Sequence, residues 1–288
     1  MPPPVAVAFR PPDPPFHPGG VPDMTRATLC SVFLSAGLVV AADPPKPVAP
    51  TDIVPASAKV EIVDASVKGE EAWAKALADA KATYAKTRDY SGYMVRQERV
   101  GGKLQAEQTA EIRVRTEPFS VYTLTLAPKS LFNQELAYMG GRKDEKVRVK
   151  AAGVAGAGGF VSVAADDAKA TVDSKYAVTS TGIGAILKRV EAALDAEKVA
   201  KASPQVVMSE YKFNDRPCTK YEIFCDRAHA KRFAARMVVY VDTEYKLPVR
   251  FEAYDAPKTG EKTGELLECV SFVKLVFNAG LGDSVFDK

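Results

Sequence analysis

Two stretches of the chain repeat their apolar residues every three or four positions, which is the spacing of one face of an α-helix. The first stretch, residues 69–88, also has acidic residues at its start and basic residues at its end, as the helix dipole favours. Its apolar stripe consists of Trp73, Leu77, Ala80 and Tyr84. The second stretch, residues 182–202, is followed by Pro204. Its stripe consists of Ile183, Ile186, Leu187, Val190 and Leu194. The pattern predicts a helix in each stretch.

Elsewhere the period of the apolar residues is two, which indicates β-strands. Ala110, Ile112 and Val114 alternate with charged residues, and the next such stretch covers residues 121–126. Further candidate strands are residues 134–139, 146–151, 159–165, 205–213, 218–225, 232–242, 247–255 and 266–278. Polar turns such as "FNDRP" and "VDTEYKLP" favour hairpins between them. The order helix, strands, helix, strands predicts an α+β fold with a large antiparallel sheet.

The N-terminal part has a different composition. Residues 1–23 contain nine of the twenty prolines and are interpreted as an extension upstream of the true start. Residues 24–42 have an apolar run followed by small residues, the pattern of a signal peptide, with cleavage predicted after Ala42. Residues 43–66 are rich in proline and alanine and are interpreted as a linker. The domain itself is predicted to span residues 67–288.

Charge and cysteine content narrow the class of protein. The net charge of the 288 residues is only +3, so no strong field favours nucleic acid as a partner. Export would permit a disulfide. Cys218 and Cys225 stand about 23 Å apart if they share one extended strand, at about 3.3 Å per residue. Any bridge would therefore use Cys269.

The sequence offers no convincing catalytic, metal or cofactor site. His229, the one histidine after the signal, lies in a polar turn and is expected to be a solvated surface residue. The motif "GVAGAGG" lacks the lysine of a phosphate-binding loop, so a flexible turn is expected. Glu98, Glu107 and Glu111 are interpreted as cross-strand ion-pair partners, because nothing fixes two carboxylates at a catalytic separation. We therefore interpret the protein as non-enzymatic, with no cofactor.

Two groups of side chains on the early strands are candidate binding residues. Arg96, Arg113 and Arg115 could contact an anionic ligand, but the favoured interpretation is a solvated outer face balanced by neighbouring acids. The aromatic and aliphatic residues that follow are predicted to face the concave side of the sheet, either as core or as the lining of a lipid cavity. These residues are Tyr122, Leu124, Leu126 and Tyr138.

Several motifs resemble one known family. "RQER", "VGGKL", "IRVRTEPFSVYTLTLAP", "KYAVTSTGIGAILKRV", "VYVDTEYKLPVRFEAYDAP" and "NAGLGDSVFD" occur in the order seen in the bacterial envelope family called domain of unknown function 1571. By further resemblance, that family is similar to the LolA and LolB lipoprotein carriers and the RseB-type sensors. The resemblance implies a strongly curved, unclosed antiparallel sheet, with two main helices over its concave face and an apolar cavity for acyl chains.

Two functional hypotheses follow. The first is an exported, periplasmic or secreted protein, peripheral to the membrane after signal cleavage, that binds a lipid or lipoprotein in the concavity of the sheet. The second is an envelope scaffold or sensor domain whose core is filled by its own side chains and whose surface binds a protein. The volume between the helix at residues 182–202 and the strand containing Tyr122 would discriminate between them.

Overall fold

The computed structural model describes residues 67–171, 174–225, 228–229 and 231–288. All of them belong to one compact unit, Pro47–Lys288. The predicted extension, signal peptide and linker within residues 1–66 lie outside the described residues.

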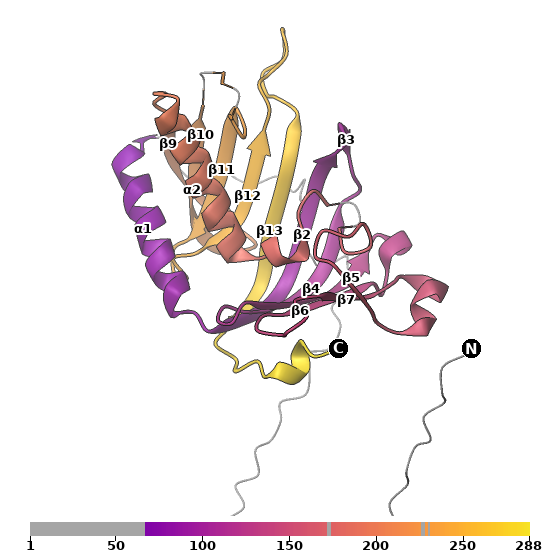
Figure 1. Cartoon of the computed structure of the whole chain (residues 1–288). Coiled ribbons are helices and arrows are strands. Elements are labelled where there is room, and N and C mark those ends of the chain that lie inside the picture. The colour runs from indigo at the N-terminus through magenta and orange to yellow at the C-terminus, as the bar shows by residue number, and fades with distance from the viewer. Residues whose placement is uncertain (1–66, 172–173, 226–227, 230) are drawn as a thin grey trace, which may run out of the picture. The chain divides into compact units, whose positions relative to one another are not determined.

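Both predicted helices are present. They are α1 (Glu70–Lys86) and α2 (Ile183–Val199), and an ion pair between Lys81 and Glu191 joins them. Helix α1 contacts β9 and α2 contacts β12, so the two helices lie together over one half of the sheet (Figure 1). Their buried residues include Trp73, Ala80, Ile186 and Val190 from the two predicted apolar stripes. The stripes therefore determined which side of each helix packs inward.

The described strands form one antiparallel sheet. In chain order they are β1 (Val67–Lys68), β2 (Asp89–Val100), β3 (Lys103–Leu104), β4 (Gln108–Arg115), β5 (Ser120–Ala127), β6 (Glu135–Met139), β7 (Val147–Lys150), β8 (Val161–Val163), β9 (Gln205–Phe213), β10 (Arg216–Phe224), β11 (Arg236–Asp242), β12 (Pro248–Tyr254) and β13 (Leu266–Phe277).

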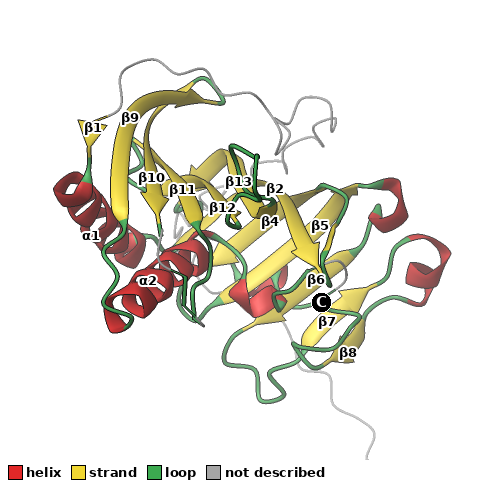
Figure 2. Ribbon diagram, turned by 90° about the horizontal axis from the view of Figure 1, so that it is seen from above, coloured by secondary structure: helices red, strands yellow, loops and turns green. Residues whose placement is uncertain are grey.

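The order of strands across the sheet is β1-β9-β10-β11-β12-β13-β2-β4-β5-β6-β7-β8, with β3 paired to β2 alone. Strands β1 and β8 stand at the two ends and do not pair with each other, so the sheet is not closed into a barrel (Figure 2). The predicted α+β class with a large, unclosed antiparallel sheet is confirmed. Consecutive strands mostly pair as hairpins. At the middle of the sheet, β13 from the end of the chain pairs with β2 from the start of the domain.

The sheet has two faces that bury different parts of the chain. We call the face that carries Ile112, Val114 and Val121 the helix face, because these residues share one apolar core with α1 and α2. We call the opposite face the outer face. Adjacent strands keep the same alternation, since Arg113 pairs with Tyr122 and Val114 with Val121.

Two segments without an α-helix cover the rest of these faces. Residues 174–182, which we call the strap, lie over the helix face, where the short helix Val178–Ser180 contacts β5 and β6. Residues 278–288, which we call the tail, lie over the outer face of β5 and β6. The tail is fixed at its start because Asp89 accepts hydrogen bonds from the backbone of Gly280 and Leu281.

The sheet topology separates the cysteines. Cys218 lies on β10 and Cys225 directly follows it, whereas Cys269 lies on β13. Strands β11 and β12 stand between them, so the gap is about 14 Å at about 4.8 Å per strand, which is beyond the reach of a disulfide. Burial raises the pKa of the Cys218 and Cys269 thiols to about 12. None of the helices in the described residues is both long enough and apolar enough to span a membrane.

Candidate functional site

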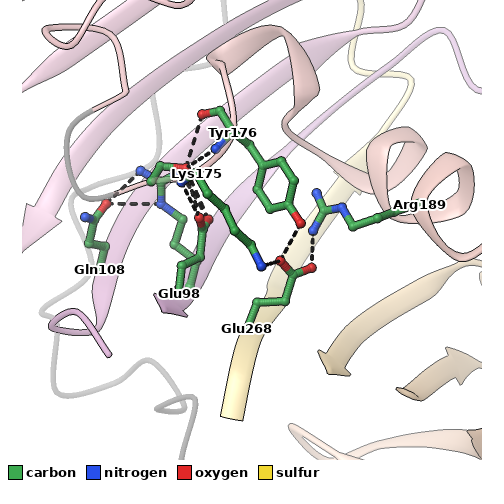
Figure 3. Close-up of polar contacts among 8 residues, drawn as sticks. Glu98, Gln108, Lys175, Tyr176, Arg189 and Glu268 are labelled. Atoms are coloured by element: carbon green, nitrogen blue, oxygen red, sulfur yellow. Dashed lines mark hydrogen bonds and ion pairs between the residues drawn. The ribbon is translucent and has the colours of Figure 1, made fainter. Parts of the chain in front are cut away.

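Two buried carboxylates face each other at the centre of the sheet. Glu98 on β2 and Glu268 on β13 are directly opposite in the register, and both point to the helix face. Their side chains are 8% and 2% exposed. Like charges placed this close repel each other, so each carboxylate needs its own set of donors. The strap and α2 supply most of those donors (Figure 3).

Three consecutive strap residues bind the two carboxylates. The hydroxyl of Ser174 lies 3.1 Å from Glu98 Oε2, and the backbone N–H of Lys175 donates to the same oxygen at 2.9 Å. The Lys175 ammonium lies 2.8 Å from Glu268 Oε2, and the Tyr176 hydroxyl donates to that oxygen at 2.6 Å. The start of the strap, residues 174–176, is therefore fixed to the sheet by hydrogen bonds and ion pairs, and Val178 adds a buried apolar contact further along.

Two arginines complete this polar cluster. Arg189 on α2 forms an ion pair with Glu268 Oε1, and its guanidinium carbon lies 3.9 Å from the centre of the Tyr176 ring. Arg96 donates to the Gln108 side chain at 2.8 Å and lies 3.8 Å from Glu98. Burial raises the pKa of Tyr176, and the charge of Glu268 adds to that effect. The phenol therefore stays protonated and remains a donor to Glu268.

The first turn of α2 is positioned by two tyrosines of neighbouring elements. The Tyr90 hydroxyl accepts a hydrogen bond from the Ile183 backbone at 2.8 Å. Gly182 permits this contact, because its φ is +96° and a Cβ there would lie 2.3 Å from the Tyr90 oxygen. Gly184 permits a similar approach of Tyr84, since a Cβ would lie 2.5 Å from that hydroxyl oxygen. The sequence "TGIGA" thus fixes the end of α2 that carries Lys188 and Arg189.

Little space remains under the strap, but an open groove lies beside it. The space between the strap, α2 and the strands amounts to about 20 Å³, room for about one water molecule. The groove has a volume of about 450 Å³ and shares Tyr176, Ser180, Thr181 and Arg189 with that inner space. Its walls are Tyr84 of α1, residues Thr116, Glu117 and Phe119 between β4 and β5, the strap residues Tyr176, Thr179, Ser180 and Thr181, and the α2 residues Gly184, Ala185, Lys188 and Arg189.

The three arginines of the sequence prediction do not form one stripe. Arg96 points to the helix face, whereas Arg113 and Arg115 point to the outer face. Arg113 pairs with Glu111 at 3.4 Å, and Arg115 forms an ion pair with Asp283 of the tail. Arg113 and Arg115, each paired with a carboxylate, resemble the outer face balanced by acids that the sequence suggested, whereas Arg96 lies on the other face and binds Gln108.

The predicted lining residues also divide between the two faces. Tyr122 and Leu124 lie on the outer face, where they pack with Phe286 of the tail rather than facing the concave side. This difference arises because Tyr122 is paired directly with Arg113 and must share its face. Leu126 and Tyr138 pack against the main core, and Tyr138 lies 6.3 Å from Phe119, ring centre to ring centre. Phe119, which was not among the predicted residues, lines the groove, whereas none of the four predicted residues does.

His229 is not the solvated residue that its polar turn predicts. Its side chain is 14% exposed, and its Nε2 lies 2.9 Å from Oε1 of Glu197, a fully buried residue near the end of α2. The three carboxylates considered for acid–base chemistry do not meet, because Glu98 points to the helix face and Glu111 to the outer face. No group of three metal-ligating side chains occurs among the residues that the structure describes.

Sequence reasoning missed most of the polar cluster. Alternation along residues 94–98 puts Arg96 and Glu98 on the side of Met94, a signal that the sequence prediction did not use when it grouped Arg96 with Arg113 and Arg115. Nothing in the sequence showed that residues 174–176 would cross that face. Glu268 could have been found by alternation with Val270 and Phe272 in "LLECVSF". Arg189 directly precedes Val190 of the α2 apolar stripe, which was the available signal that its charge lies at the edge of the core.

The fold and the site define an α+β protein with an open antiparallel sheet, two helices over one half and a groove beside the strap. The chain belongs to the family described as "Protein of unknown function (DUF1571)", whose model matches residues 87–288. This confirms the family resemblance stated from the motifs. A comparison with curated proteins gave no match.

Solved structures with some likeness come from several bacteria. A putative outer membrane lipoprotein-sorting protein domain from Vibrio parahaemolyticus has 12% identity and a TM-score of 0.36, over 74% of this chain and 97% of that one. A LolA superfamily protein from Nitrosomonas europaea has 13% identity and a TM-score of 0.29, over 77% and 98%. The lipoprotein LppX of Mycobacterium tuberculosis has 8% identity and a TM-score of 0.42, over 74% and 98%. The family assignment rests on the family model, and the fold on the sheet topology above.

Proposed function

We propose that this protein is an exported, non-enzymatic component of the cell envelope that binds an apolar or acylated ligand, a lipid or a lipoprotein. The observation that carries the proposal is the groove of about 450 Å³ between α1, α2 and the strap. Ligand sites in proteins typically have volumes of about 300 to 1,000 Å³. The groove lies beside α2, which shifts the expected site from the centre of the concavity to its side.

The lining of the groove suits a ligand with an apolar part. The aromatic rings of Tyr84, Phe119 and Tyr176 belong to three different elements and line one continuous space, together with Ala185. The Tyr84 hydroxyl faces the α2 backbone and the Tyr176 hydroxyl binds Glu268, so both phenols use their polar ends elsewhere. The parts of these rings that line the groove, which for Tyr176 exclude the face covered by Arg189, provide apolar surface for a bound chain.

The test is ligand binding by the full chain purified from the envelope fraction of a bacterial host. We expect native mass spectrometry and organic extraction to detect an acyl compound, and a fluorescent fatty acid to bind with saturation. Ala185→Trp should fill the groove and abolish uptake of the probe. Val199→Trp, which adds the same ring at an exposed position near the other end of α2, is the control and should leave uptake unchanged. Absence of extracted ligand together with absence of probe binding would refute the proposal.

A second candidate function is favoured by the small space under the strap. The inner volume of about 20 Å³ means that α2 and the strap already fill the centre of the concavity with side chains of the protein itself. A filled interior is the arrangement expected of an envelope scaffold or sensor that binds a protein on its surface. One stoichiometric protein co-purifying with the chain, with no probe uptake, would support this function instead.

Export is part of the proposal and has its own measurement. The signal pattern in residues 24–42 predicts a mature N-terminus at Asp43. N-terminal sequencing of the protein recovered from the periplasm or the medium should therefore begin at Asp43. A mature terminus upstream of this residue would contradict the predicted signal peptide.

A further inference from the structure

Two walls of the groove, the strap and α2, contribute polar donors. The strap contributes three consecutive hydroxyls, from Thr179, Ser180 and Thr181, and α2 contributes the ammonium of Lys188. Across the described residues, the side chains of these four take part in no hydrogen bond or ion pair. The aromatic residues Tyr84 and Phe119 line other walls of the same groove. The groove thus combines apolar rings with a set of unengaged donors.

From this arrangement we propose that the ligand of the groove is an amphiphile with an anionic head group, a phosphate or a carboxylate, and that Lys188 binds this head group. The inference rests on the proposed function and adds the chemical class of the ligand. The strap hydroxyls can donate to the oxygens of the head group, while Lys188 supplies the opposite charge. The acyl part then lies against the aromatic rings.

The other cations near the site cannot take this role without losing a partner. Arg189 is bound to Glu268, Lys175 is bound to the same carboxylate, and Arg96 is bound to Gln108. Withdrawing any of them would leave a buried carboxylate or amide short of a donor, which is costly in a desolvated site. Lys188 is exposed and can bind a ligand without breaking an existing contact.

The groove also contains one acidic residue, Glu117. Glu117, between β4 and β5, lies on a different wall from Lys188 and likewise has no side-chain partner within the part of the chain that the structure describes. Its charge repels an anion, so a head group near Lys188 is favoured over one near Glu117. The two residues should therefore have opposite effects on the same ligand when their charges are removed.

The test uses the full chain and two probes of equal length, hexadecanoic acid and hexadecanol, in competition with a fluorescent acyl probe. Wild-type protein should bind the acid about three- to tenfold more tightly than the alcohol, the range of one partly exposed charge-assisted contact. Lys188→Gln should remove this preference by weakening the binding of the acid. Glu117→Gln should increase the preference. Lys198→Gln, on α2 and paired with Asp195 outside the groove, should change neither affinity.

The outcomes separate this inference from the function on which it rests. Equal binding of acid and alcohol, unaffected by Lys188→Gln, would overturn the anionic head group while leaving an acyl site in place. Failure of both probes to bind would refute the proposed function and the inference with it. Displacement of the fluorescent probe by inorganic phosphate alone, as strongly as by the acid, would show a site for a free anion and overturn the amphiphile.

Discussion

The strap and the tail both cover the sheet without an α-helix, but they are fixed to it by different forces. The strap lies over the helix face, where Ser174, Lys175 and Tyr176 bind two buried carboxylates. The tail lies over the outer face, where the fully buried ring of Phe286 packs beside Tyr122 and Ala137. The start of the strap thus depends mainly on polar contacts that must all be satisfied, whereas the end of the tail depends mainly on burial of one apolar ring.

This difference shows how each cover should fail. Removing one donor from the strap leaves a carboxylate buried with fewer partners, and that cost falls on the whole domain, since Glu98 and Glu268 lie on the two central strands. If the ring of Phe286 is removed, the tail can detach from the sheet while the rest of the domain stays folded. The loss of stability then cannot exceed the free energy with which the tail docks on the sheet. The ion pairs of the tail contribute little, because Asp283 and Asp287 are 70% and 62% exposed.

The largest expected effect is that of Arg189→Ala. The change removes the ion pair to Glu268 and the contact with Tyr176, so the free energy of unfolding should fall by about 3 kcal/mol. Urea unfolding followed by circular dichroism measures it. Lys188→Ala, at the exposed neighbouring position, is the control and should change stability by less than about 0.5 kcal/mol. Equal effects of the two variants would show that the strap does not depend on its buried charges.

A smaller effect is expected for Phe286→Ala. Full loss of a buried phenylalanine costs about 3 to 5 kcal/mol, but local release of the tail should limit the loss here to about 2 kcal/mol. Hydrogen exchange should show faster exchange in residues 280–287 while the strap stays protected. The control, Asp283→Asn, should cost less than about 1 kcal/mol, and the cost should vanish in 1 M salt. Faster exchange in the strap as well would mean that the two covers are coupled.

The smallest effect concerns acid pH. Burial opposes ionisation of Glu135, but hydrogen bonds from Lys150 and the Tyr122 hydroxyl outweigh it and lower the pKa of this carboxyl. A lowered pKa contributes stability above the unfolded pKa of about 4.3, and that contribution is lost as the pH falls through the folded pKa. The stability difference between wild type and Glu135→Gln should therefore narrow from pH 6 to pH 3.

Urea titrations at the two pH values measure this narrowing. Glu117→Gln provides the control, because Glu117 is exposed and has no side-chain partner among the described residues, so its difference from wild type should stay constant. If the stability difference between wild type and Glu135→Gln also stayed constant from pH 6 to pH 3, ionised Glu135 would not stabilise the fold.

Much of the fold could be predicted from the sequence, because helices and strands are recorded in the spacing of apolar residues. Periods of three to four located α1 and α2, and alternation located the strands from β4 to β13 and the outer position of Arg113 and Arg115. The candidate site could be predicted only in part. Alternation shows which residues of one strand share a face, but not which face of the neighbouring strand lies on the same side. That Tyr122 shares a face with Arg113 therefore became clear only from the register between β4 and β5.

By itself, then, the sequence determined the secondary structure, the α+β class and the family, since these follow from local periodicity and from short motifs in a fixed order. Only the tertiary structure decided that Glu98 and Glu268 face each other, that residues 174–176 bind both, and that Tyr122 is covered by the tail. Each of these contacts joins residues far apart in the chain. Their energies depend on burial and on exact partners, which no local pattern records.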